Sequence, residues 1–124
     1  MKTVVIVEDD LDIRSLIETI FSMDPRFAVA GVADSAEDAV EVARTTSPEI
    51  IVLDNRLAGK MTGVDAVPEL RATAPQAKII LFTAHGDLQA RVDEENNVDA
   101  FLLKTETGAL LPLAQQLTNM LSLI

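Results

Sequence analysis

The sequence Ile50-Ile51-Val52-Leu53-Asp54 is a continuous apolar run that ends on a carboxylate. Runs of about four apolar residues are typical of strands buried on both faces, as in a parallel sheet covered by helices. Three further runs share this pattern and also end on reactive side chains: residues 4–7 run into Glu8-Asp9-Asp10, residues 79–82 into Thr83, and residues 101–103 into Lys104. If the runs are parallel strands, their polar ends meet at one edge of the sheet, where ligands bind in such folds.

Strand and helix signals alternate five times along the 124 residues, without repeats or linker-like segments. The apolar pattern predicts strands over residues 4–7, 28–33, 50–53, 78–82 and 100–103. A helix is expected after each strand, the third over about 64–74 and the fourth over about 87–95. Short connections favour right-handed crossovers and a doubly wound parallel sheet. We predict one α/β domain over residues 1–124, a flavodoxin-like three-layer α/β/α fold with five strands in the order 2-1-3-4-5.

Capping residues and prolines set the expected ends of the helices. Ser35 begins a capping sequence, and Ser47-Pro48 ends the same helix. Pro68 falls early in the third helix, where it is compatible with helical structure only in the first turn. Pro112 leaves the start of the last helix open.

The composition excludes several classes of protein. Ten basic and twenty acidic residues give a net charge of −10, which is unsuited to direct nucleic-acid binding because phosphates require clustered lysines and arginines. The chain has no cysteine, so disulfides and thiolate metal sites are excluded. No apolar run approaches the roughly 18 residues of a membrane span, and no signal peptide is visible. We therefore expect a cytoplasmic protein that does not enter the membrane.

Three carboxylates, of Glu8, Asp9 and Asp54, are expected side by side, because strands one and three are neighbours in this order. Carboxylates held this close repel one another unless a cation lies between them. Oxygen ligands without histidine or cysteine favour Mg²⁺, with Mn²⁺ as a second choice. A carboxylate beside such a cation can attack a phosphoryl group and form an acyl phosphate, which makes Asp54 the candidate nucleophile. Lys104 and the Thr83 hydroxyl are then suited to bind the other phosphoryl oxygens.

In combination, these motifs resemble the receiver domain of two-component response regulators over essentially the whole chain. The resemblance rests on an acidic pair, an acceptor aspartate, a hydroxyl residue before an alanine, and a lysine that ends an apolar strand: Glu8-Asp9, Asp54, Thr83-Ala84 and Lys104. Each motif alone is common, whereas their order and spacing together are highly specific.

The resemblance implies a role for each of these residues. Asp9 would ligate Mg²⁺ directly and Glu8 mainly through water. Asp54 would ligate the metal and accept the phosphoryl group, and the backbone carbonyl of Arg56 would be a further ligand. Lys104 would contact the phosphoryl group. The protein would catalyse its own phosphorylation and dephosphorylation without being a turnover enzyme.

The resemblance also implies a switch and a set of partners. Thr83 would move toward the phosphoryl group, which lets Phe101 rotate inward and reshapes the face formed by helix four, strand five and helix five. The phosphodonor would be a sensor histidine kinase, a histidine phosphotransfer protein or a small phosphodonor. An output domain or protein would bind the reshaped face, and homodimer formation on phosphorylation is compatible with this scheme.

Two segments depart from the family pattern, the one after Lys104 and the loop after Asp54, where Ala58 stands in place of a common proline. Thr105 follows Lys104, where the family usually has proline in a cis bond. A cis bond before a residue other than proline costs about 3 kcal/mol, so a trans bond is expected here. Gly63 comes one position later than usual after the acceptor. Neither departure removes a chemical group, so we expect phosphorylation to be retained and the coupling to output to be open to change.

Three alternatives share part of this sequence pattern. A phosphohydrolase with a nucleophilic aspartate usually carries a second aspartate two positions on, where this chain has Arg56. A flavin-binding protein needs a phosphate-binding loop rich in glycine or hydroxyl groups, whereas residues 8–10 are all acidic. The nearest alternative is a receiver-like interaction module whose output does not depend on phosphorylation.

Overall fold

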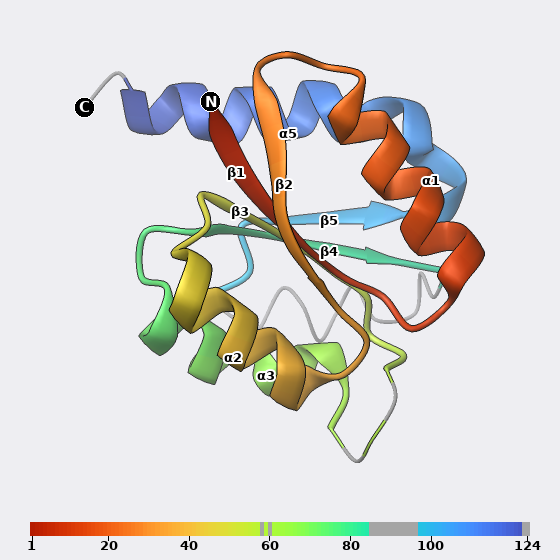
Figure 1. The fold of residues 1–124 in the computed structure, drawn as a ribbon, viewed down its shortest axis with the longest axis vertical. Coiled ribbons are helices and arrows are strands. Elements are labelled where there is room, and N and C mark those ends of the chain that lie inside the picture. Colours follow the sequence, from red (N-terminus) through yellow and green to blue (C-terminus); the bar gives the residue numbers. More distant parts are fainter. Residues whose placement is uncertain (58, 60, 85–96, 123–124) are drawn as a thin grey trace.

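The computed structural model describes residues 1–57, 59, 61–84 and 97–122, and Figure 1 shows their arrangement. Five parallel strands form one sheet in the order β2-β1-β3-β4-β5, and their bounds are β1 Lys2–Val7, β2 Phe27–Ala33, β3 Ile50–Leu53, β4 Lys78–Thr83 and β5 Ala100–Leu103. The described helices are α1 Leu11–Ser22, α2 Ala36–Thr46, α3 Gly63–Thr73, the 3-10 helix Lys104–Ala109 and α5 Leu110–Ser122. The predicted doubly wound sheet and its strand order are confirmed. The predicted helix over 87–95 lies outside the described residues.

The central strands contribute alternate side chains to two separate cores. In β1, Val5 and Val7 join one core, whereas Val4 and Ile6 join the other. The same alternation continues through β3 and β4. All four residues of β3 are buried, which explains why the sequence shows a continuous apolar run there.

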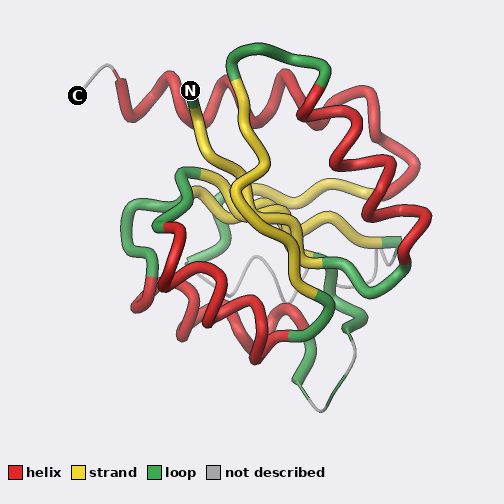
Figure 2. The backbone as a smooth tube through the Cα atoms, in the orientation of Figure 1, coloured by secondary structure: helices red, strands yellow, loops and turns green. Residues whose placement is uncertain are grey.

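The helices cover both faces of the sheet, as Figures 1 and 2 show. On one face, Ile17 and Phe21 of α1 pack into the same core as Leu110 and Ala114 of α5. On the other face, α2 and α3 supply the small and branched side chains of the second core. Within the described residues, no helix is both long enough and apolar enough to cross a bilayer.

Polar side chains close the helix ends next to the carboxyl edge of the sheet. Asp10 is the N-cap of α1, and its carboxylate accepts hydrogen bonds from the backbone N–H groups of Asp12 and Ile13. Ser35 caps α2 as predicted, by accepting from the N–H of Asp38. Each cap fixes the point at which the chain turns from a strand into the following helix.

The two helix prolines behave differently. Pro112 lies in the first turn of α5, where its missing N–H removes no helical hydrogen bond. Pro68 lies inside α3, beyond the first turn, so the condition that the helix accommodates it only in the first turn does not hold. Its ring nitrogen cannot donate to the carbonyl of Val64, four residues earlier. Burial of neighbouring residues such as Val67 and Leu70, together with a capping box at the helix start, stabilises α3 despite this loss.

Candidate functional site

Two neighbouring strands bring the first acidic residues together. β1 and β3 pair in parallel and end level with each other, with Val7 opposite Leu53. The backbone N–H of Asp54 donates to the carbonyl of Val7 at 3.0 Å, which extends the pairing by one residue. Glu8 and Asp54 therefore leave the sheet side by side at its carboxyl edge.

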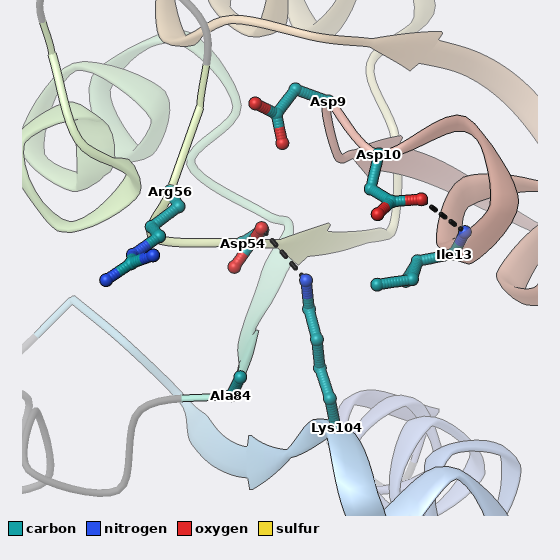
Figure 3. Close-up of a pocket in the computed structure, with 7 residues that line it drawn as sticks. All are labelled: Asp9, Asp10, Ile13, Asp54, Arg56, Ala84 and Lys104. Atoms are coloured by element: carbon teal, nitrogen blue, oxygen red, sulfur yellow. Dashed lines mark hydrogen bonds and ion pairs between the residues drawn. The ribbon is translucent and has the colours of Figure 1, made fainter.

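Glu8, Asp9 and Asp54 form the predicted acidic cluster. One carboxylate oxygen from each residue lies within 4.8 Å of the others. Glu8 is 1% exposed and Asp54 is 5% exposed, whereas Asp9 is exposed. Figure 3 shows the Asp9 and Asp54 side chains on either side of the same space. Carboxylates held this close disfavour one another's charged forms unless positive charge lies between them.

Lys104 supplies the positive charge within the site. Its Nζ lies 2.5 Å from Glu8 Oε1 and 3.0 Å from Asp54 Oδ2, and its side chain is 17% exposed. The residue follows β5 directly and begins the 3-10 helix, from which its side chain extends toward Asp54 (Figure 3). The ammonium thus bridges the buried members of the cluster.

The buried charges shift the ionisation of both partners. Burial raises the pKa of Glu8 to about 8, and the neighbouring Asp54 carboxylate acts in the same direction while Lys104 opposes it. Burial lowers the pKa of Lys104, but the hydrogen bonds and charges of Glu8 and Asp54 outweigh burial and raise it overall. The raised pKa of Glu8 favours a protonated carboxyl, whereas its contact with Lys104 favours a carboxylate. Burial is the largest of these effects, so we assign Glu8 a pKa above its ordinary value.

The donor set of the cluster fits a hard divalent cation. The cluster offers carboxylate oxygens only, which suits Mg²⁺ better than a metal that prefers nitrogen or sulfur. Oε2 of Glu8 is buried and has no hydrogen-bond partner among the described residues. Because an unpaired buried carboxylate oxygen is costly, a bound cation or its water would satisfy an acceptor that the protein leaves open.

A pocket of about 200 Å³ opens onto the cluster, and Figure 3 shows its lining residues: Asp9, Asp10, Ile13, Asp54, Arg56, Ala84 and Lys104. Ile13 is a site residue that was not predicted from the sequence. Asp10 caps α1, and Ile13 lies three residues later in the first turn of this helix. This turn places the Ile13 side chain at the wall of the pocket. An apolar residue three places after a capping acid was the signal available in the sequence.

The remaining predicted site residues take different positions. Arg56 has an exposed side chain that lines the pocket. Thr83 is fully buried at the end of β4, whereas the following residue, Ala84, reaches the pocket wall. Phe101 is half-buried in β5, opposite Leu81, and packs against the core under α2 and α3. The structure therefore brings Lys104 into direct contact with two of the acids. Thr83 lies buried in the sheet, and Phe101 packs against the core under α2 and α3.

Asn55, which the sequence analysis did not assign, joins the end of β3 to the start of α3. Its side-chain oxygen accepts from the N–H of Val64 at 3.2 Å, and its backbone carbonyl accepts from the N–H of Gly63 at 2.9 Å. A Cβ on Gly63 would lie 2.0 Å from the carbonyl oxygen of Asp54, so only glycine fits there. The backbone after Asp54 is thus held against the first turn of α3.

Comparison with known families and curated proteins gives a consistent result. A model of the response regulator receiver domain matches residues 4–114. A protein-glutamate methylesterase/protein-glutamine glutaminase 2 from Paramagnetospirillum magneticum is 36% identical over 107 residues, covering 86% of this chain and 28% of that protein. A nitrate/nitrite response regulator protein homolog from Haemophilus influenzae is 32% identical over 112 residues, covering 87% of this chain and 52% of that protein. The chain thus spans about half or less of these curated relatives.

Solved structures share the same fold. The signal receiver domain of the response regulator NarL from Mycobacterium tuberculosis superposes with a TM-score of 0.80 at 25% identity, covering 92% of this chain and 96% of that one. The response regulator protein TrrA from Thermotoga maritima, solved in complex with Mg²⁺-BeF, gives a TM-score of 0.81 at 22% identity, covering 94% of this chain and 97% of that one. The second likeness shows the fold alone.

Proposed function

The chain belongs to the response regulator receiver domain family of two-component signalling, and from this premise we propose that it accepts a phosphoryl group on Asp54 in the presence of Mg²⁺. The observation that carries the proposal is the contact of Lys104 with Glu8 and Asp54 inside a cluster of three carboxylates. This arrangement combines a nucleophile, a cation site and a fixed positive charge in one pocket.

Mg²⁺ would be held by Asp9 and Asp54, by Glu8 mainly through water, and by the backbone carbonyl of Arg56. When bound, the cation supplies positive charge to the oxygens of the incoming phosphoryl group. The carboxylate-only donor set and the open Oε2 of Glu8 support this assignment. The Mg²⁺-BeF complex of TrrA, a protein of the same fold, is consistent with it.

Asp54 is the proposed nucleophile. One of its carboxylate oxygens would form the new O–P bond while the bond from phosphorus to the donor breaks, and the donor would leave with that electron pair. The negative charge of the phosphoryl group would draw Lys104 from its carboxylate partners toward a phosphoryl oxygen. Burial of Asp54 limits access of water to the product.

Thr83 and Phe101 are the proposed link from the site to the rest of the molecule. Movement of Thr83 toward the phosphoryl group would open space for Phe101, which is only half-buried in β5. The affected surface would include β5 and α5 together with the predicted helix over 87–95.

The donor is a sensor histidine kinase, a histidine phosphotransfer protein or a small phosphodonor, and the receiver of the signal is an output domain or protein on the β5 and α5 face. The chain matches about half of the relatives named as nitrate/nitrite response regulators, which supports a role as the receiver part of a larger response regulator. We propose that the protein is cytoplasmic and that it accepts a phosphoryl group without being a turnover enzyme.

The alternative, an interaction module whose output does not depend on phosphorylation, is disfavoured. The chain has all three acidic residues and Lys104, which phosphorylation requires.

Intact mass spectrometry tests the proposal. The wild type is incubated with acetyl phosphate and Mg²⁺, beside Asp54→Asn and beside a sample with EDTA. We expect the mass of one phosphoryl group to be added only to the wild type with Mg²⁺. Equal labelling of Asp54→Asn would overturn the assignment of the acceptor, and labelling in EDTA would overturn the role of the metal.

A further inference from the structure

The segment after β5 directs Lys104 into the site although Thr105, and not a cis-proline, follows the lysine. Lys104 and Thr105 are joined by a trans bond, because no cis peptide occurs among the described residues. Lys104 nevertheless reaches both Glu8 and Asp54. Some other feature of the chain must therefore fix the backbone at this point.

We propose that Glu106 is a positioning residue. Its carboxylate binds the backbone of Leu103, on the other side of Lys104 in the sequence, and so sets the direction in which the Lys104 side chain leaves the backbone. The backbone N–H of Leu103 donates to Oε1 of Glu106 at 3.0 Å. This bond joins the residue before Lys104 to the second residue after it, so Lys104 and Thr105 lie within a closed turn. A carboxylate acceptor makes the bond charge-assisted and stronger than one between neutral groups.

Both ends of this turn are anchored. Leu103 is the last residue of β5 and pairs with Thr83 of β4. Glu106 lies inside the 3-10 helix Lys104–Ala109, where its backbone leaves helical geometry with φ −108° and ψ 36°. At this kink the side chain of Glu106 turns back and accepts the hydrogen bond from Leu103. Lys104 is thus held between the sheet and the kinked helix.

The direction of the Lys104 backbone affects the site through the contacts of its ammonium. Lys104 Nζ lies 3.0 Å from Asp54 Oδ2, and Lys104 approaches carboxylates that are almost fully buried. A shift of about 1 Å at the backbone of Lys104 would lengthen these contacts unless the flexible side chain adopts another rotamer, so we expect a moderate effect on the site. Glu106 itself is exposed, so its substitution leaves the core intact.

The test rests on the proposed function and separates geometry from charge. Glu106→Gln retains an accepting oxygen without the charge, whereas Glu106→Ala removes the acceptor. Glu69→Ala, at an exposed glutamate of α3, is the matched control. Four quantities are measured: the rate of labelling by acetyl phosphate, the Mg²⁺ dissociation constant, the melting temperature and the amide proton shift of Leu103.

We expect Glu106→Ala to slow labelling about fivefold with an unchanged Mg²⁺ dissociation constant, because the metal ligands are untouched. Glu106→Gln and Glu69→Ala should stay within about twofold of the wild type. In a Lys104→Ala background, Glu106→Ala should have no further effect, because it acts through Lys104. The Leu103 amide shift should move in Glu106→Ala and return toward the wild-type value in Glu106→Gln.

An unchanged Leu103 amide shift in Glu106→Ala would overturn the proposal, whether or not the wild type is labelled. Labelling of Glu106→Ala at the wild-type rate would also overturn it, as would an equal loss in the Lys104→Ala background. A wild type that is not labelled at all would overturn the proposed function, and the amide shift would still decide the role of Glu106.

Discussion

At the scale of single residues, the site depends on one ammonium group between two buried carboxylates. Lys104→Met keeps most of the side-chain volume and removes the charge. We expect the rate of labelling by acetyl phosphate to fall by about 100-fold, which is the typical cost of removing one group that stabilises developing charge. The time course of intact mass measures this rate.

Lys78→Met is the control for this substitution. Lys78 begins β4 at the opposite edge of the sheet, and its Nζ lies 3.9 Å from Asp99. Labelling of this variant should match that of the wild type. If both variants lost the same labelling rate, the effect would come from the net charge of the protein and not from the position of Lys104 in the site.

Glu8 makes the stability of the metal-free protein depend on pH. The folded protein keeps the Glu8 proton up to about pH 8, whereas the unfolded chain releases it near the ordinary value of 4.5. Between these values the folded state binds more protons, so the free energy of unfolding should fall as the pH rises from about 4.5 to about 8. Melting temperatures measured by circular dichroism in EDTA at pH 5, 6.5 and 8 test this trend.

Glu8→Gln cannot titrate and supplies the matched control. The melting temperature of the wild type should fall relative to that of Glu8→Gln across this range. A difference between the two proteins that stays constant with pH would contradict a raised pKa for Glu8.

At the scale of elements, α3 is fitted against the strand that carries the acceptor. Gly63→Ala would place a methyl group 2.0 Å from the carbonyl oxygen of Asp54, so the helix or the strand end must move. We expect a loss of about 3 kcal/mol or more in the free energy of unfolding, together with slower labelling. Urea denaturation measures the first effect and intact mass the second.

Gly108→Ala is the corresponding control, because nothing lies within 4 Å of a Cβ at this position in the 3-10 helix. Its stability should stay within about 0.5 kcal/mol of the wild type. Equal losses in the two variants would show that the effect is one of glycine content and not of contact with Asp54.

Arg71 ties α3 to the amino ends of β4 and β5. Its guanidinium donates to the carbonyl of Ala77 at 2.5 Å, to the carbonyl of Asn97 at 2.7 Å and to the Asp99 carboxylate at 2.7 Å. Asp99 also accepts from the N–H of Ile79 at 2.8 Å. Arg71→Met removes all of these hydrogen bonds from the guanidinium, so we expect the free energy of unfolding measured by urea denaturation to fall by about 2 kcal/mol.

The exposed Arg44 provides a comparison for Arg71. Arg44 pairs only with Glu41 along the surface of α2 among the contacts of the described residues. Arg44→Met should therefore cost less than about 0.5 kcal/mol. If both arginines cost the same, the contacts of Arg71 across the three elements would contribute nothing beyond a surface ion pair.

The elements also show what a sequence can and cannot predict. The bounds predicted for the strands over 50–53 and 100–103 agree with those observed. For residues 50–53 the reason is burial on both faces, which leaves an unbroken apolar run. The condition that Pro68 must lie in the first turn of its helix was wrong, because the packing that stabilises α3 involves residues distant in sequence. The roles of Asn55 and Glu106 depend on hydrogen bonds that local composition does not reveal.

At the scale of the whole molecule, the order of the strands creates the site. All five strands run parallel, but the chain adds β2 on one side of β1 and β3, β4 and β5 on the other. This reversal of strand order places the ends of β1 and β3 side by side, so residues 46 positions apart form one cluster. This arrangement could be predicted from alternation and connection rules alone. The balance of charge inside the cluster could not, because the bridging contacts of Lys104 depend on the path of the chain after β5.

We propose Asp54 as the acceptor, and not another acid at the same edge of the sheet. To test this, the wild type is incubated with Mg²⁺ and acetyl phosphate, the acyl phosphate is reduced with borohydride to homoserine, and the product is located by peptide mass spectrometry. We expect homoserine at position 54 alone. Homoserine at Asp9 or Asp10, or no homoserine in protein that carries an added phosphoryl group, would overturn the assignment of Asp54.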